Sequence, residues 1–219
     1  MNNKPSISAV AFDMDGLIFN TEDLYDQVGE ILLSRRGLNF TRELKMEMMG
    51  LPAPTAYEIM RERCAITDSV LQLQTETDEI FDDLLPKQLR TMPGLETLLQ
   101  KLESKKIPKI VATSSHRKFA DRNLAQFELT HRFEFILTAE DVTQGKPHPE
   151  IYLTASEKLE VAPLNLLVLE DSKTGSTAAA ASGAFTIAVP TDHSIGLDFS
   201  HVNHVASRLD DDFILSLFD

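Results

Sequence analysis

The sequence has a single cysteine, few basic residues and no long hydrophobic run. Because Cys64 is alone, an internal disulfide and a zinc site built from cysteines are both excluded, which fits a reducing compartment. No apolar run approaches the length that spans a membrane, and residues 1–5 show no signal-peptide pattern. We therefore expect a cytoplasmic protein.

Positive charge is scarce. Lysine and arginine number 21 against 34 aspartates and glutamates, which gives a formal net charge of −13. Nucleic-acid backbones and anionic membranes both select a basic surface, so we expect neither as a partner. The same acidity disfavours small anionic substrates, so a phosphate site would need local positive charge from a metal ion, a lysine and backbone amides.

The composition is otherwise that of a globular chain. With 219 residues, 42% of them hydrophobic and 25% charged, the chain can form one main core and an inserted subdomain. It shows no internal repeat, low-complexity tract or flexible linker. We expect a monomer.

Helical patterns without a strand signal fill residues 21–90. Apolar residues recur at helical spacing over 21–36, 41–49, 54–63 and 69–85. Asn20 or Thr21 can cap the first helix, Gly50 should end the second, and Pro86 should end or kink the fourth. This block predicts a small all-helical domain.

From Met92 onward, strand patterns alternate with helical patterns. The predicted strands lie at 109–113, 134–138, 165–169 and 185–189, and the predicted helices at 95–105, 117–127, 149–159 and 175–182. This alternation predicts an α/β fold: a Rossmann-like, mostly parallel sheet in a three-layer core formed by residues 1–20 and 91–219. Residues 191–204 are predicted to be a polar loop, and residues 213–218 a short helix.

Two carboxylates follow the first predicted strand, an apolar run over residues 10–12. Alternate residues of a strand face the same way, so Asp13 and Asp15 would meet one reacting centre, and Gly16 begins a turn. The two charges can coexist if a cation lies between them or if one keeps a proton. Either arrangement suits phosphoryl transfer, with Asp13 attacking phosphorus and Asp15 acting as acid and then base. A solvated turn is the alternative.

Polar residues also follow two other predicted strands. Thr113, Ser114 and Ser115 precede a helix, whose free amides favour an anion, although a plain helix cap would also place serine there. Glu170 and Asp171 end another apolar strand, where buried acids require a cation or a proton and suit Mg²⁺. The alternative for Asp171 is again a helix cap.

Lys146 lies in the segment Gly145-Lys146-Pro147-His148-Pro149. Glycine permits a tight turn and proline restricts the backbone, so the lysine is held in a defined place. The alternative is a solvent-exposed lysine that only aids solubility.

These segments resemble, in the correct order, the four motifs of the haloacid dehalogenase-like superfamily of phosphohydrolases. The resemblance covers residues 12–175 and includes Asp-x-Asp-Gly followed by Thr21 and Glu22. It implies that Asp13 is the nucleophile and that Lys146 pairs with Asp13 and the phosphate. It also implies that Ser114, or else Thr113, binds the phosphate.

The resemblance further implies a Mg²⁺ ion. Asp13, the main-chain carbonyl of Asp15 and Asp171 would hold it, with Glu170 assisting directly or through water.

The helical insertion at 21–90 resembles the cap of the branch that contains β-phosphoglucomutase, pseudouridine-5′-phosphatase and small sugar phosphatases. We expect that cap to close over the site, with Thr21 and Glu22 near the hinge. We also expect four residues to contact the substrate: Thr21, Glu22, Ser115 and His116. The resulting hypothesis is a Mg²⁺-dependent phosphatase that hydrolyses a small phosphomonoester, either a sugar phosphate or a nucleoside monophosphate, through an aspartyl-phosphate.

Three other activities compete with hydrolysis. A phosphomutase needs a cation in its cap, yet Leu51 stands where β-phosphoglucomutases carry an arginine and Tyr25 where they carry a histidine. Four basic cap residues could still supply that charge: Arg42, Lys45, Arg61 and Arg63. Dehalogenases lack an acid equivalent to Asp15. A non-enzymatic module that signals through phospho-aspartate would need neither Asp15 nor a cap.

Overall fold

The structure is a computed structural model that describes residues 5–48 and 53–219. The chain divides into two compact units, one formed by Met1–Phe19 and Thr91–Asp219 and the other by Asn20–Arg90. We call them the core unit and the helical unit. That the helical unit acts as a cap stays a prediction.

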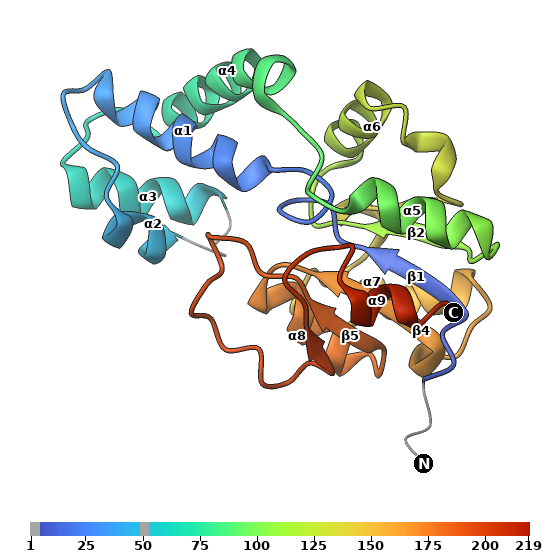
Figure 1. The fold of residues 1–219 in the computed structure, drawn as a ribbon. Helices are drawn as coiled ribbons and strands as arrows, with labels where there is room; N and C mark the ends of the chain where they lie inside the picture. Colours follow the sequence, from blue (N-terminus) through green and yellow to red (C-terminus); the bar gives the residue numbers. More distant parts are fainter. Residues whose placement is uncertain (1–4, 49–52) are drawn as a thin grey trace. The chain divides into compact units, whose positions relative to one another are not determined.

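The core unit contains a sheet in the order β3-β2-β1-β4-β5-β6 (Figure 1). The strands are β1 (Ala9–Phe12), β2 (Lys109–Ala112), β3 (Ile136–Leu137), β4 (Leu166–Glu170), β5 (Phe185–Ala188) and β6 (His204–Val205). Every neighbouring pair is parallel. The predicted α/β class is therefore confirmed.

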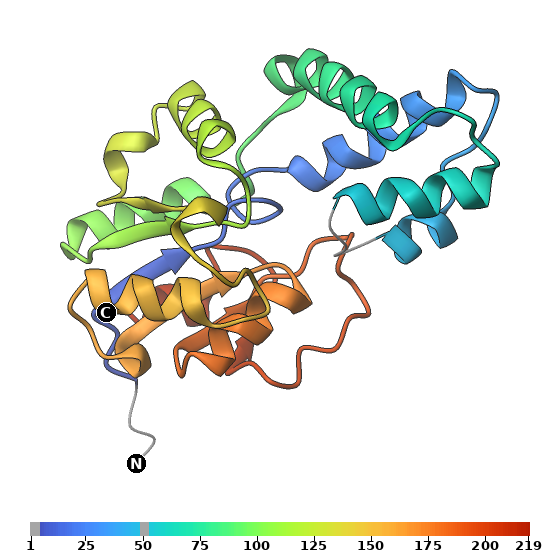
Figure 2. The ribbon, with the colours of Figure 1, turned by 180° about the vertical axis from the view of Figure 1, so that it is seen from behind.

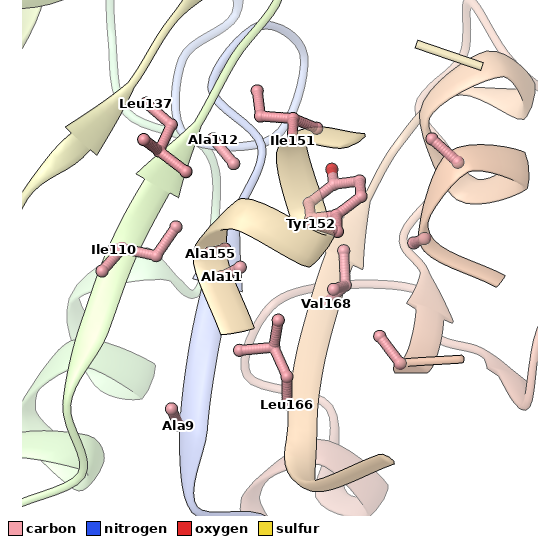
Figure 3. Packing of buried hydrophobic residues seen from close by; sticks show 13 residues of the cluster. Ala9, Ala11, Ile110, Ala112, Leu137, Ile151, Tyr152, Ala155, Leu166 and Val168 are labelled. Carbon is pink, nitrogen blue, oxygen red and sulfur yellow. The ribbon is translucent and has the colours of Figure 1, made fainter. Parts of the chain in front are cut away.

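One face of the sheet is covered by α7 (Glu150–Lys158) and α8 (Lys173–Ala181), as Figure 3 shows for α7. Alternate strand residues point to this face and form a buried cluster with both helices. The cluster contains Ala9, Ala11, Ile110, Ala112, Leu137, Ile151, Tyr152, Ala155, Leu166, Val168, Ala178, Ala179 and Ala184. Its many alanines allow the helices to approach the sheet closely.

The opposite face carries α5 (Leu95–Ser104) and α9 (Asp212–Ser216), which lie in front of the sheet in Figure 1, whereas α7 lies in front in Figure 2. The apolar residues of α5 recur at helical spacing, and Leu98, Leu99 and Leu102 are fully buried. Helix α6 (Arg117–Gln126) connects β2 to β3. The sheet therefore lies between two helical layers, as predicted.

The helical unit contains α1 (Thr21–Ser34), α2 (Arg42–Met48), α3 (Ala53–Cys64) and α4 (Val70–Gln88). Ser69 begins α4 with a capping box, since its hydroxyl accepts from the amide of Gln72 while the Gln72 side chain accepts from the amide of Ser69. Tyr25 of α1 and Phe81 of α4 pack against each other, with ring centroids 4.8 Å apart and the ring planes tilted by 35°. Buried apolar side chains on both helices complete the interior: Leu24, Val28, Leu32, Leu73, Ile80 and Leu85.

Two local predictions differ from the structure. Pro86 was predicted to end or kink α4. The helix continues past Pro86 to Gln88, so Pro86 does not end it, and the kink stays a prediction. Proline removes only one amide so close to the helix end, and Leu89 still donates to the Leu85 carbonyl at 3.0 Å. The predicted loop at 191–204 ends in β6, whose two residues are too short to produce a strand pattern. The predicted stop at Gly50 lies outside the described residues.

Among the residues that the structure describes, no helix combines the length and the apolar character needed to cross a membrane.

Candidate active site

The candidate site lies at the carboxyl ends of three adjacent strands, β2, β1 and β4. Asp13 follows β1, Thr113 follows β2 and Glu170 ends β4. Because the strands are parallel, these ends meet at one edge of the sheet, where α/β proteins bind ligands. Lys146 reaches this edge from the segment between η2 (Ala139–Asp141) and α7.

The ammonium group of Lys146 contacts all three strand ends. Its Nζ atom lies 2.6 Å from Oδ1 of Asp13 and 2.7 Å from Oε1 of Glu170, and it donates to the carbonyl of Ala112 at 2.9 Å. Burial lowers the pKa of Lys146, but the carboxylates of Asp13 and Glu170 outweigh this effect and hold the pKa well above its usual value. Lys146 therefore stays charged.

Asp13 is buried beside other acids. Its pKa is raised well above the ordinary value, first by burial and then by the negative charge of Glu170, while Lys146 opposes the rise. One oxygen from each of Asp13, Glu170 and Asp171 lies within 4.8 Å of the others. These buried acids carry more negative charge than the ammonium of Lys146 balances, so a cation would fit among them.

Glu170 is fully buried and held at both oxygens. Oε1 accepts from Lys146 and from the Tyr152 hydroxyl at 2.5 Å, and Oε2 accepts from the Ser172 hydroxyl at 3.1 Å. The backbone of Gly175 packs against the same carboxylate, and a Cβ there would lie 1.8 Å from Oε1. Only glycine allows this approach.

Asp15 is held by hydroxyls that follow β2. Its Oδ2 atom accepts from Ser115 at 2.7 Å and from Thr113 at 3.2 Å. Gly16 follows in a left-handed conformation, φ +80°, and a Cβ there would lie 2.1 Å from Oδ2 of Asp171. The turn thus brings the Asp15 segment against Asp171.

The two residues on either side of Ser115 are exposed. Ser114, predicted to bind phosphate, lies at the strand end with its side chain open to solvent. His116, predicted to contact substrate, precedes α6 with 83% of its side chain exposed and its Nδ1 3.1 Å from Oε1 of Glu140. Both roles stay predictions.

Hydrogen bonds to the Glu150 side chain stabilise the turn that carries Lys146. The Glu150 carboxylate accepts from the amides of Thr143 at 2.6 Å and Gln144 at 2.9 Å, and these bonds lower its pKa. The amide of His148 donates to the Gly145 carbonyl at 3.0 Å, which closes the turn around Lys146. The backbone therefore presents Lys146 in one defined place.

Thr21 and Glu22 begin α1 in the helical unit. Thr21 is fully buried, and Glu22 lines a cavity of about 340 Å³ within that unit. Their predicted contact with substrate stays a prediction.

The sequence predicted no role for Tyr152 and none in the site for Ser172. It gave Thr113 only as the alternative to Ser114 for binding phosphate. The two-residue spacing of Thr113 and Ser115 is a signal that both hydroxyls can face Asp15. No comparable signal marks Tyr152, because the rotation of α7 about its axis decides which residue reaches Glu170.

Known proteins resemble this chain over most of its length. Residues 10–189 match the family described as haloacid dehalogenase-like hydrolase. A phosphorylated carbohydrates phosphatase of Thermotoga maritima is 33% identical over 81% of this chain and 82% of its own. A (DL)-glycerol-3-phosphatase of Arabidopsis thaliana is 35% identical over 98% of this chain and 89% of its own.

Among solved structures, a putative β-phosphoglucomutase from Thermotoga maritima matches with a TM-score of 0.82 and 29% identity. The match covers 96% of this chain and 98% of that one. The fold, the order of the motifs and the relatives agree: this chain belongs to the haloacid dehalogenase-like hydrolases.

Proposed function

We propose that this chain is a Mg²⁺-dependent phosphatase that hydrolyses a small phosphomonoester through an aspartyl-phosphate on Asp13. The observation that carries the proposal is the buried contact between Lys146 and Asp13, beside a second acid, Asp15. The two curated relatives, which act on phosphorylated carbohydrates and on glycerol 3-phosphate by their names, support a small phosphorylated substrate.

In the first step, a carboxylate oxygen of Asp13 attacks phosphorus and the bond between phosphorus and the ester oxygen breaks. Asp15 donates a proton to the departing oxygen, which leaves as an alcohol. Lys146 opposes the negative charge that develops around phosphorus. Hydroxyls of Thr113 and Ser115 keep Asp15 oriented for this transfer.

In the second step, water attacks the phosphorus of the aspartyl-phosphate and the bond to Asp13 breaks. Asp15, now ionised, takes a proton from that water. Inorganic phosphate is released, Asp13 is again a carboxylate, and Asp15 is again protonated. The requirement for this acid favours phosphate over halide, because a halide leaves without a proton.

The buried acids fit a Mg²⁺ ion. Asp13, Asp171 and the main-chain carbonyl of Asp15 would hold it, with Glu170 close by, because oxygen ligands suit this ion. When bound, Mg²⁺ neutralises charge on the acids and the phosphate oxygens. A cation held among these acids would lower the pKa of Asp13 again and would favour the ionised carboxylate that attacks phosphorus.

The test is phosphate release by the full chain. We expect Mg²⁺-dependent turnover of at least one member of a panel of sugar phosphates, glycerol phosphates and nucleoside monophosphates, and loss of turnover in Asp13→Asn. Asp192→Asn, the same exchange at an exposed residue after β5, should remain active. Absence of phosphate release from the whole panel by the wild type would refute the proposal.

Phosphate transfer within a sugar phosphate is the second candidate, because the putative β-phosphoglucomutase structure is so similar. A mutase must grip a second phosphate with a cation in its cap. Three of the basic residues that could do so are already paired with carboxylates at 2.6–2.7 Å: Lys45 with Asp26, Arg61 with Glu58 and Arg63 with Glu47. A sugar-phosphate isomerisation assay with a bisphosphate primer separates the two activities, and we expect hydrolysis.

The remaining expectations belong to this proposal. We take a monomer as the default state and expect a cytoplasmic location, which size-exclusion chromatography and localisation of the tagged full chain would check. If the chain were a non-enzymatic module that signals through phospho-aspartate, it would phosphorylate itself stably without turnover. The panel assay distinguishes such a module from a phosphatase.

A further inference from the structure

We infer that Tyr152 is a positioning residue for Lys146, acting through the carboxylate of Glu170. The inference rests on the proposed phosphatase function and adds a role for Tyr152, for which the sequence predicted none. Tyr152 is fully buried and lies on α7, whereas Glu170 ends β4.

The geometry links the three side chains directly. The Tyr152 hydroxyl donates to Oε1 of Glu170 at 2.5 Å, and Lys146 donates to the same oxygen at 2.7 Å. The Lys146 Nζ atom also lies 5.1 Å from the centroid of the Tyr152 ring, within the range of a cation–π contact. Tyr152 therefore contacts both members of the ion pair.

The hydroxyl has a different role from the ring. The ring packs in the buried cluster under α7, and in Figure 3 its hydroxyl oxygen points toward the carboxyl ends of the strands. Packing alone would be satisfied by phenylalanine. The hydroxyl adds a hydrogen bond to an ionised acceptor, which is stronger than a neutral one.

That hydrogen bond limits how Glu170 can rotate. The terminal torsion of a glutamate is broad, so a carboxylate without fixed donors can turn within its cavity. Here Tyr152 and Lys146 fix Oε1, and Ser172 fixes Oε2. A fixed Oε1 in turn fixes the point at which the Lys146 ammonium lies between Glu170 and Asp13.

The position of the ammonium has its largest effect on the rate in the transition state, while one bond to phosphorus forms and the other breaks. Lys146 stabilises charge that develops in the transition state, and such stabilisation falls steeply when the donor is misplaced. We expect residues other than Lys146 to bind the leaving group. Loss of the Tyr152 hydroxyl should therefore lower kcat and leave KM nearly unchanged.

The first experiment compares Tyr152→Phe with wild type on the best substrate of the panel. We expect kcat to fall about tenfold and KM to change by less than about twofold, at a temperature where circular dichroism shows both proteins folded. Ser156→Ala is the matched control, because it removes another buried hydroxyl of α7, for which the described residues offer no hydrogen-bond partner. Its kcat should equal that of the wild type.

The second experiment measures binding without turnover. Calorimetric titration with orthovanadate, which adopts the geometry of a phosphoryl group in transfer, should show about tenfold weaker binding to Tyr152→Phe. Inorganic phosphate should bind both proteins within about twofold, because it resembles the ground state. If Tyr152 had only a structural role, its replacement would weaken the binding of vanadate and of phosphate to the same extent.

Two results would overturn the inference: a kcat of Tyr152→Phe within about twofold of wild type, or equal weakening of vanadate and phosphate binding. Wild-type turnover is measured first. If the wild type releases no phosphate from any substrate, the proposed function fails and the role of Tyr152 fails with it. If the wild type is active and Tyr152→Phe matches it, only the role of Tyr152 fails.

Discussion

The Nζ atom of Lys146 lies 2.6 Å from Oδ1 of Asp13, although 133 positions separate the two residues in the chain. Only 5% of the Lys146 side chain and 9% of the Asp13 side chain is exposed. The free energy needed to remove two charges from water exceeds the attraction between them unless further hydrogen bonds compensate. Here Glu170 and the Ala112 carbonyl also accept from Lys146, so the lysine is the centre of a buried polar network.

Replacing Lys146 with alanine should therefore affect stability as well as activity. The change leaves the carboxylates of Asp13 and Glu170 buried without their ammonium partner, and we expect the free energy of unfolding to fall by about 3–5 kcal/mol. Urea unfolding in the presence of a metal chelator measures this. Lys105→Ala, at an exposed lysine that follows α5, should change stability by less than about 0.5 kcal/mol. Equal stability of the two variants would contradict the network.

Gly175 should not tolerate alanine. An added Cβ would meet Oε1 of Glu170 at 1.8 Å, so the helix or the carboxylate must move, which costs about 1–3 kcal/mol and displaces Lys146. We expect a lower thermal midpoint and a lower kcat. Gly145→Ala is the control, since nothing lies within 4 Å of its Cβ and its φ is not positive. A stable, fully active Gly175→Ala would show that the packing around Glu170 is looser than described.

Mg²⁺ should stabilise the folded chain. A ligand that binds only the folded state raises the thermal midpoint, and we expect a rise of several degrees at millimolar Mg²⁺. Asp171→Asn should abolish most of this rise, because it removes one carboxylate from the acidic cluster, whereas Asp192→Asn should keep it. Thermal unfolding with and without chelator gives the comparison. An identical rise in both variants would exclude Asp171 as a ligand.

The helical unit should lose stability in acid through Glu76. Hydrogen bonds from Arg36, and then from Arg35, hold the pKa of Glu76 below its ordinary value of 4.5. A carboxyl group with a lowered folded pKa stabilises the fold above the unfolded pKa, and this contribution disappears as the pH falls through the folded pKa. The wild type should therefore lose stability from about pH 4.5 downward.

Glu76→Gln should remove that contribution. We expect it to be less stable than wild type at pH 7 by about 1 kcal/mol, with the difference shrinking toward pH 3. Glu58→Gln, in an exposed pair with Arg61, should follow the wild type at every pH. Denaturant unfolding from pH 7 to pH 3 measures this. A constant difference in the free energy of unfolding between wild type and Glu76→Gln would contradict the prediction.

Much of the fold follows from local patterns. The strand β1 is buried on both faces, so it reads as a continuous apolar run, and alternation with helices then predicts a parallel sheet. Short elements such as β6 are not predicted this way, because two residues are too few to show the alternation of a strand. Pro86 was predicted to end or kink α4, yet the helix continues past it, because proline lowers the stability of a helix without always ending it.

The candidate site was predictable to the level of segments. Parallel strands bring their carboxyl ends together, so Asp13 and Glu170 could be grouped before any contact was known, whereas the pairing of Lys146 with Asp13 came from the family resemblance. Contacts between individual atoms depend on side-chain rotation and helix packing. Thus the hydrogen bond that the Ser115 hydroxyl donates to Asp15 was not predicted, and the predicted contact of Ser115 with substrate stays a prediction.

In the proposed reaction, phosphate passes through a covalent bond to Asp13. Rapid acid quenching of the enzyme during turnover, followed by proteolysis and mass spectrometry, tests it most directly. We predict one phosphoryl group on the peptide that contains Asp13, and none in Asp13→Asn. Turnover with no phosphorylated peptide, or with the group on Ser114 or His116, would contradict the account.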